Sequence, residues 1–307
     1  MRSHTDVLLC HQVREHTPGA PRSDCHHGAA GGLQWYAGVR AMRTSEWIVV
    51  GYLACLVAGA IVRRLPAGRR RTLFITAPGV VAAIVTTARL PQTPVVTAFR
   101  DWLPGVYLLA GYWLSGLFHT RPAHRLEEQL ARFDRRLGLD GRSDLGARLP
   151  RPVLEYLEGA YLLVYPLVPA ALLVIVLLGG SRSADHFWTV VLLACYGSYS
   201  TLVLFMTRPP RATEQPAGGA ASRGVLLRKA NLFILDRGSI QVNTLPSGHA
   251  AGALAAALVV AEVAPLAGAI FTWLALSVAA GSVVGRYHYA IDSILGLLMA
   301  VGAWLAV

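Results

Sequence analysis

Charged residues are scarce in this chain. Only 15% of its 307 residues are charged, whereas 54% are hydrophobic, and soluble domains usually carry about 25% charged residues. The mean hydropathy is +0.47. The apolar residues fall into separate blocks of about 18–21 residues, which is the length that a helix needs to cross a bilayer. The composition therefore excludes an ordinary soluble protein and predicts an all-α, polytopic transmembrane helical bundle.

Lysine is almost absent. Lys229 is the only lysine, so arginine carries most of the net charge of +11. The basic residues lie in short loops between apolar blocks, not on one soluble domain, and this distribution argues against a nucleic-acid partner. The planar guanidinium of arginine suits phosphate oxygens. Arginines are also common at membrane borders, so the bias alone does not choose between these readings.

Cysteine is limited to Cys10, Cys25, Cys55 and Cys195. Two of the four lie inside apolar blocks, and no disulfide framework is indicated. The polar stretch 1–45 contains the other two beside histidines, but their spacing matches no zinc pattern. We expect this stretch to be a disordered or non-native extension, with Met42 as an alternative start.

Hydropathy predicts eight membrane spans. They cover residues 46–62, 72–88, 102–118, 159–179, 187–206, 247–264, 266–285 and 289–307. The second is the weakest, because it is short and contains Pro78. Pro166 and Pro169 predict a kink in the fourth. We expect two extra spans within 46–99 and a catalytic domain over 100–307.

The loop between the third and fourth spans has helical periodicity. Leu126, Leu130, Phe133 and Leu137 recur at helical spacing among charged residues. This pattern predicts an amphipathic helix that lies on the membrane surface.

Three polar clusters stand at the ends of spans. They are Arg208-Pro209-Pro210-Arg211, then Asn243-Thr244-Leu245-Pro246-Ser247-Gly248-His249, and finally Gly285-Arg286-Tyr287-His288-Tyr289-Ala290-Ile291-Asp292. Span five ends on the face where span six begins. Span six crosses away and span seven returns. The topology therefore predicts that all three clusters meet on one membrane face.

His288 and Asp292 are spaced four residues apart, so a helix beginning there carries them on one face. A carboxylate so placed can bond one imidazole nitrogen and leave the other free as a nucleophile. A His–Asp pair that only caps a helix would have the same spacing.

Ser247, Gly248 and His249 indicate a helix N-terminus. Ser247 is a natural cap, and Gly248 allows a ligand to approach the backbone. Free amides and the helix dipole there favour an anion, with His249 placed to protonate a leaving oxygen. An ordinary capped start of a span remains the alternative.

Arg208, Arg211 and Arg286 can donate hydrogen bonds to phosphate oxygens. Each one alone could equally be a border residue. A metal site is not indicated, because only Asp292 accompanies the two histidines as an evident ligand.

Together these motifs resemble the type 2 phosphatidic acid phosphatase superfamily, and within it the inositol phosphorylceramide synthase-like branch. The family pattern joins an Arg-Pro stretch, a Pro-Ser-Gly-His stretch and a His-x-x-x-Asp stretch, found here at Arg208, at Pro246 and at His288. The resemblance covers about residues 100–307 and implies a six-helix core.

The resemblance also implies roles. His288 would form a phosphohistidine, Asp292 would orient it, and His249 would protonate the leaving group. Arg208, Ser247, Gly248 and Arg286 would hold the phosphate, and no metal or other cofactor would be needed.

Two positions depart from the family pattern. Ser282 stands where the family has an arginine, so Arg286 must replace it. Thr201 stands where the family has a lysine, and Arg211 is the candidate substitute.

We therefore expect a lipid phosphate substrate, hydrolysed through a phosphohistidine. Transfer of a phospho-headgroup between lipids and a non-catalytic membrane protein that keeps the fold are the alternatives. The loops at 63–71 and 119–152 hold five and eight arginines. By the positive-inside rule they favour a cytoplasmic site, whereas the resemblance to bacterial relatives favours the outer face of a cell membrane.

Overall fold

The computed structural model describes residues 42–119, 122–139, 148–213 and 225–307. Within these residues the chain is all-α, with no strand beyond one bridge pair between Thr207 and Asn243. The expectations for Cys10, Cys25 and nearly all of the stretch 1–45 lie outside the described residues.

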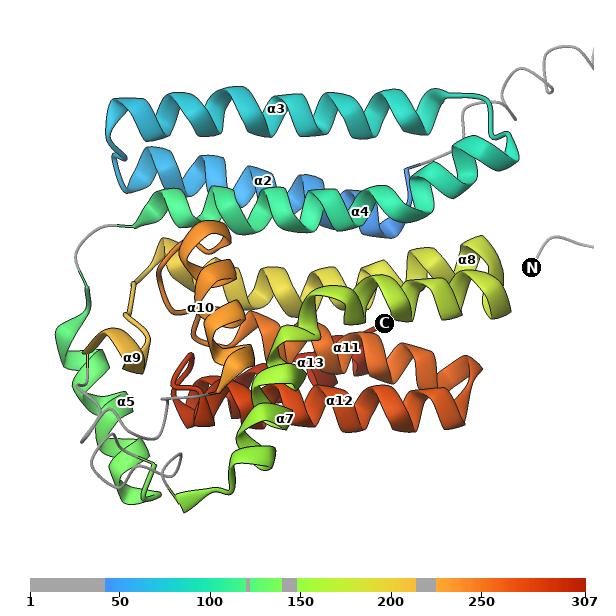
Figure 1. Ribbon diagram of the computed structural model, residues 1–307. Helices are drawn as coiled ribbons and strands as arrows, with labels where there is room; N and C mark the ends of the chain where they lie inside the picture. The colour runs from blue at the N-terminus through green and yellow to red at the C-terminus, as the bar shows by residue number, and fades with distance from the viewer. Residues whose placement is uncertain (1–41, 120–121, 140–147, 214–224) are drawn as a thin grey trace, which may run out of the picture. The chain divides into compact units, whose positions relative to one another are not determined.

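Helices occupy all eight intervals that hydropathy predicted (Figure 1). The helices are α2 Thr44–Val62, α3 Ala67–Arg89, α4 Pro94–Ser115, α5 His124–Arg136, α7 Arg151–Leu162, α8 Val164–Ser200, α9 Pro210–Thr213, α10 Leu226–Gly238, α11 Gly248–Val263, α12 Pro265–Val284 and α13 Ala290–Leu305, with short 3₁₀ turns at Gly116–Phe118 and Thr201–Val203.

Three of these helices, α2, α3 and α12, are each long and apolar enough to cross a membrane. The bent pair formed by α7 and the first part of α8 would make a fourth span, and α11 and α13 are apolar but shorter. The second predicted interval, which was expected to be the weakest span, therefore forms a helix long and apolar enough to cross a membrane. Pro78 lies inside an uninterrupted helix of 23 residues.

The predicted kink is present, but it lies slightly earlier than the prolines. The chain bends by 58° between Leu162 and Val164. Pro166 has no amide hydrogen with which to bond the carbonyl of Leu162, so a continuous helix would lose a bond there. Pro169 lies farther on, inside α8.

Helix α8 folds back on itself (Figure 1). Tyr165, near its start, packs against His249 of α11. Tyr199, near its end, lies against Gly248 of the same helix. A straight helix would separate these two tyrosines by about 50 Å. The two arms of α8 thus correspond to the fourth and fifth predicted spans.

Helix α11 lies at the centre of the described bundle. It packs against α8, α12 and α13, and its small residues are almost all buried. Gly296 of α13 lets the two helices approach closely, since a Cβ there would come within 2.5 Å of the carbonyl oxygen of Ser247. Small residues at helix contacts are typical of membrane bundles.

Helix α5 confirms the predicted amphipathic helix in the long loop, with Leu130 buried and Leu126 and Phe133 half-buried. Its buried residues are Glu127, Leu130 and Asp134, whereas Leu137 is exposed. The two buried acids bond to other segments, because Glu127 pairs with Arg208 and Asp134 accepts from the amide of Ala290. The face that the hydrophobic spacing selected is therefore partly a polar contact surface.

Candidate active site

The three polar clusters converge in space, as the topology predicts. The amide of Asn243 donates to the carbonyl of Thr207, and the amide of Ser247 donates to the carbonyl of Asp292, both at 2.8 Å. The amide of Arg211 donates to the carbonyl of Arg286 at 3.1 Å. Backbone bonds therefore tie the segments together.

His288 and Asp292 face each other at the start of α13. His288 Nδ1 lies 3.7 Å from Asp292 Oδ2, and both side chains are buried. At this distance they are close but not hydrogen-bonded. Neither His288 Nδ1 nor Asp292 Oδ1 has a hydrogen-bond partner among the described residues. The two side chains that the spacing predicted to pair are therefore neighbours without a hydrogen bond between them.

Asp292 also caps its helix. Its Oδ2 accepts from the amide of Tyr289 at 3.0 Å and from Asn243 Nδ2 at 2.7 Å. The carboxylate that lies beside His288 therefore also caps α13, as the capping alternative expected. Asn243 belongs to one of the predicted clusters, but nothing in the sequence pattern assigns it a partner 49 residues away.

The backbone before His288 is held by Ser282. Its carbonyl accepts from the amides of both Tyr287 and His288, at 2.8 and 3.0 Å. Its hydroxyl lies 2.8 Å from that of Ser293. The serine that replaces a family arginine thus helps to fix the turn that carries His288. Arg286, within this turn, has a positive φ of 63°.

His249 lies one residue into α11. Its ring is 6.0 Å from that of His288, centroid to centroid. It also packs against Tyr161 at 5.4 Å and Tyr165 at 6.0 Å. The two histidines therefore approach each other across a space whose other wall is aromatic.

The start of α11 is capped as predicted, and two of its first amides are bonded within the protein. Ser247 Oγ accepts from the amide of Ala250, and the amide of Gly248 donates to Thr244 Oγ1 at 3.1 Å. Two of the amides expected to bind an anion are thus bonded within the protein. Gly248 is needed for packing, since a Cβ there would lie 2.4 Å from the ring of Tyr199.

The three arginines differ in their surroundings. Arg211 lines the cavity with both histidines, and burial lowers the pKa of its guanidinium. Arg208 instead donates through Nε and Nη2 to Glu127 at 3.1 and 2.8 Å. Arg286 donates through Nη1 to the carbonyl of Leu139 at 2.6 Å. Neither Arg208 nor Arg286 is among the cavity-lining residues.

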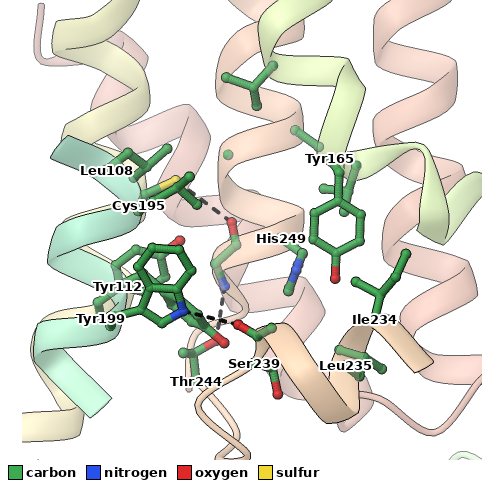
Figure 2. Close-up of a pocket in the computed structure, with 18 of the residues that line it drawn as sticks. Leu108, Tyr112, Tyr165, Cys195, Tyr199, Ile234, Leu235, Ser239, Thr244 and His249 are labelled. Carbon is green, nitrogen blue, oxygen red and sulfur yellow. Dashed lines mark hydrogen bonds between the residues drawn. The ribbon is translucent and has the colours of Figure 1, made fainter. Parts of the chain in front are cut away.

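The cavity has a volume of about 510 Å³ and is lined by α4, α7, both arms of α8, α10, α11 and the turn before α13. Figure 2 shows His249 and Tyr165 on one side of it and Tyr112 and Tyr199 on the other. No sequence pattern distinguishes these tyrosines from the other tyrosines in apolar spans, so they were not among the predicted site residues.

Tyr287 connects the site to a second buried acid. Its hydroxyl donates to Glu158 at 2.6 Å, and its ring stacks on Tyr161 at 4.3 Å. Burial, followed by the neighbouring carboxylate, raises the pKa of Tyr287 well above its usual value. Glu158 also bonds Arg228 and Asn231. This cluster fixes the residue adjacent to His288. In the described part of the chain, no three His, Cys, Asp or Glu side chains gather as a metal site would require.

The fold and this site define a helical membrane protein with a pair of histidines, one of them beside a carboxylate, on an apolar cavity. A family model described as the PAP2 superfamily matches residues 128–306, more than half of the chain. The protein therefore belongs to the PAP2 superfamily, and the apolar helices agree with the membrane location of that family. The superfamily comprises phosphatases and phosphotransferases, so the chain is an enzyme of the phosphoric ester hydrolase type.

The match supports the superfamily and leaves the synthase-like branch a prediction. It begins within α5, so α2, α3 and α4 lie outside it. Comparisons with curated proteins and with solved structures gave no match.

Proposed function

We propose that this protein is a membrane-embedded phosphatase that hydrolyses a phosphate ester of a lipid or polyprenyl substrate through a phosphohistidine. The observation that carries the proposal is the approach of His249 and His288 in one cavity with Arg211, with Asp292 directly behind His288. A nucleophile, an orienting acid, a proton donor and a cation are the groups that phosphoryl transfer requires.

In this mechanism Asp292 bonds Nδ1 of His288, which leaves Nε2 as the nucleophile. Nε2 attacks phosphorus, and the bond from phosphorus to the ester oxygen breaks. His249 gives its proton to that oxygen, and the lipid alcohol leaves. A water molecule then attacks the phosphohistidine and gives a proton to His249, releasing phosphate and restoring both histidines. Arg211 offsets the negative charge of the transferred group.

The 3.7 Å separation of His288 from Asp292 is compatible with this sequence of steps. Catalytic hydrogen bonds are often long before substrate binds and shorten in the complex. We further propose that Arg208 and Arg286 contribute to phosphate binding only after exchanging partners, since the former is paired with Glu127 and the latter with Leu139. Ser247 and Gly248 shape the start of α11 that presents His249.

The first experiment measures phosphate release by the purified protein in detergent from phosphatidic acid and from a polyprenyl phosphate. His288→Ala should abolish release, and EDTA should leave the wild-type rate unchanged. His186→Ala is the matched control, because this histidine pairs with Glu262 elsewhere in the bundle. Activity that survives in His288→Ala would exclude the covalent mechanism, and loss with EDTA would exclude the metal-independent one.

Transfer of a phospho-headgroup, as in the synthase-like branch, is the second candidate. Arg286-Tyr287-His288-Tyr289 favours it, because this run resembles that branch. The two reactions differ only in the acceptor, which is water or a lipid hydroxyl. Supplying a phosphodiester phospholipid as donor and a hydroxyl-bearing lipid as acceptor, and following the headgroup by mass spectrometry, separates them.

Two arguments about the membrane face oppose each other. The resemblance favours the outer face. The arginine-rich turn between α2 and α3 lies on the same side as the site, since Arg63 bonds the carbonyl of Leu204 and Arg69 that of Leu117. This placement favours the cytoplasmic face under the positive-inside rule. Labelling a cysteine introduced at Ser239 with a membrane-impermeant maleimide in intact cells decides between them.

A further inference from the structure

The cavity extends far beyond the two histidines. Its lining includes Trp102 and Gly105 of α4, and Trp188 of α8, none of which is near the polar clusters in sequence. Among the described lining residues, Arg211 is the only Arg, Lys, Asp or Glu. The space is therefore polar where His249, His288 and Arg211 meet and apolar along the rest of its length.

The spacing of lining residues along α4 and α8 gives nearly the same length for the apolar part of the cavity. Tyr112 lies beside Tyr199 near the site, and Trp102 lies ten residues earlier in α4, which corresponds to about 15 Å along a helix. Trp188 lies eleven residues before Tyr199 in α8, which corresponds to about 16 Å. This is close to half of the bilayer's hydrocarbon core of about 30 Å, or the depth of one leaflet. In Figure 2 Leu108 and Cys195 lie farther along this wall than Tyr112 and Thr244.

The cavity also has an apolar, exposed side. Val106, Leu109 and Trp113 line it, yet 60%, 50% and 51% of their surfaces are exposed. All three belong to α4, an apolar helix of a membrane protein. The span predicted at 102–118 places this exposed side in the hydrocarbon, so that a lipid can enter the cavity without leaving the membrane.

Building on the proposed function, we infer that the apolar chain of the substrate lies in this cavity along α4, a helix outside the family-matched region, and that Gly105 and Trp102 determine how long a chain fits. A phosphate placed between His249 and His288 leaves its ester-linked lipid pointing along the apolar part. At Gly105 an added Cβ would lie 3.3 Å from the ring of Trp188. A larger side chain there must occupy space that the lipid chain would use.

The main test compares chain preference. Full-length wild type, Gly105→Leu and Trp102→Ala are assayed in mixed micelles with dihexanoyl phosphatidic acid, dioleoyl phosphatidic acid and a phosphatidic acid whose acyl chains are longer than oleoyl. Gly105→Leu should lower the ratio of kcat/KM for the long chain to that for the short chain about tenfold, the effect of a pocket that no longer fits. Trp102→Ala should raise acceptance of chains longer than oleoyl.

Gly51→Leu is the matched control. It makes the same change in α2, at a glycine with no atom within 4 Å of an added Cβ, and should leave the chain preference as in wild type. An unaltered ratio in Gly105→Leu would overturn the inference. If Gly105→Leu does not fold, Trp102→Ala is the deciding variant. An unaltered chain preference in Trp102→Ala would then overturn the inference.

A binding experiment separates this inference from the proposed chemistry. Phosphatidic acid with a diazirine at the end of its acyl chain is cross-linked to the His288→Ala protein and the adducts are mapped by mass spectrometry. Adducts at Trp102–Val106 or Trp188 support the inference even if wild type releases no phosphate, a result that would overturn the proposed function alone. Adducts confined to exposed residues away from the cavity, such as Ile270 and Trp273 of α12, would refute the inference that the acyl chain lies in the cavity.

Discussion

Two buried acid–base pairs in this protein have opposite character. Glu46 of α2 and Arg100 of α4 form a closed pair, with three contacts of 2.7–2.9 Å between guanidinium and carboxylate. His288 and Asp292 remain 3.7 Å apart. Both pairs are buried. The first joins two N-terminal helices, and the second lies on a cavity.

The difference follows from what each pair must do. A buried ion pair is tolerated only when its hydrogen bonds are satisfied, and the closed pair meets this condition. A nucleophile and its orienting acid need a geometry that tightens when substrate arrives. Buried donors and acceptors without a partner are costly, so they are most readily explained where a ligand completes them. Four substitutions can test this comparison.

The largest expected effect comes from Asp292→Asn. The amide cannot hold the imidazole in the required tautomer as the carboxylate does, so phosphate release should fall by about 10²–10⁴-fold, the range for a positioned acid–base group. Steady-state kinetics on phosphatidic acid measures it. Asp236→Asn, on the exposed side of α10, is the control. Normal kinetics in Asp292→Asn would show that the pair only caps α13.

Glu46→Ala should reduce stability rather than catalysis. It leaves Arg100 buried without its carboxylate, and breaking a buried pair costs about 3–5 kcal/mol. Thermal unfolding in detergent should show a lower midpoint, while activity per folded molecule remains close to wild type. Glu128→Ala, an exposed acid on α5, should change neither. A Glu46→Ala protein with an unchanged unfolding midpoint and a lower rate of phosphate release would show that the Glu46–Arg100 pair contributes to catalysis and not to stability.

Asn243→Ala should have an intermediate effect on catalysis. It removes the 2.7 Å bond to Asp292, and hydrogen bonds to charged groups contribute about 1.5–3 kcal/mol. We expect kcat to fall about 10–100-fold with little change in KM. Gln129→Ala on α5 is the control. Asn243→Leu is measured beside it. If both variants lower kcat and the unfolding midpoint to the same extent and neither shifts the pH profile of kcat, Asn243 acts through packing and does not position Asp292.

The smallest effect concerns Glu127 and Arg208. Burial raises the pKa of Glu127, but hydrogen bonds and the charge of Arg208 outweigh it, so the pKa lies below 4.5. A carboxylate with a lowered folded-state pKa adds stability above its unfolded pKa and loses it as pH falls through the folded value. Glu127→Gln should remove this pH dependence below about pH 5, as measured by unfolding midpoints across pH 3–7. An identical acid profile in wild type and variant would contradict it.

The sequence alone determined the class of fold and predicted the pair of histidines and the aspartate of the candidate site. Apolar blocks of membrane-spanning length can hardly be accommodated except as helices, because backbone groups in a bilayer must bond within their own segment. The spacing of His288 and Asp292, and the order of the three clusters, then required one shared face.

Other features were decided only by tertiary structure. The sequence could not show that Glu127 pairs with Arg208 or that Asn243 donates to Asp292, because each bond joins residues distant along the chain. It also gave no sign that α4 forms a wall of the cavity. Hydrophobicity records that a side chain avoids water, but not whether it faces lipid, a neighbouring helix or a substrate.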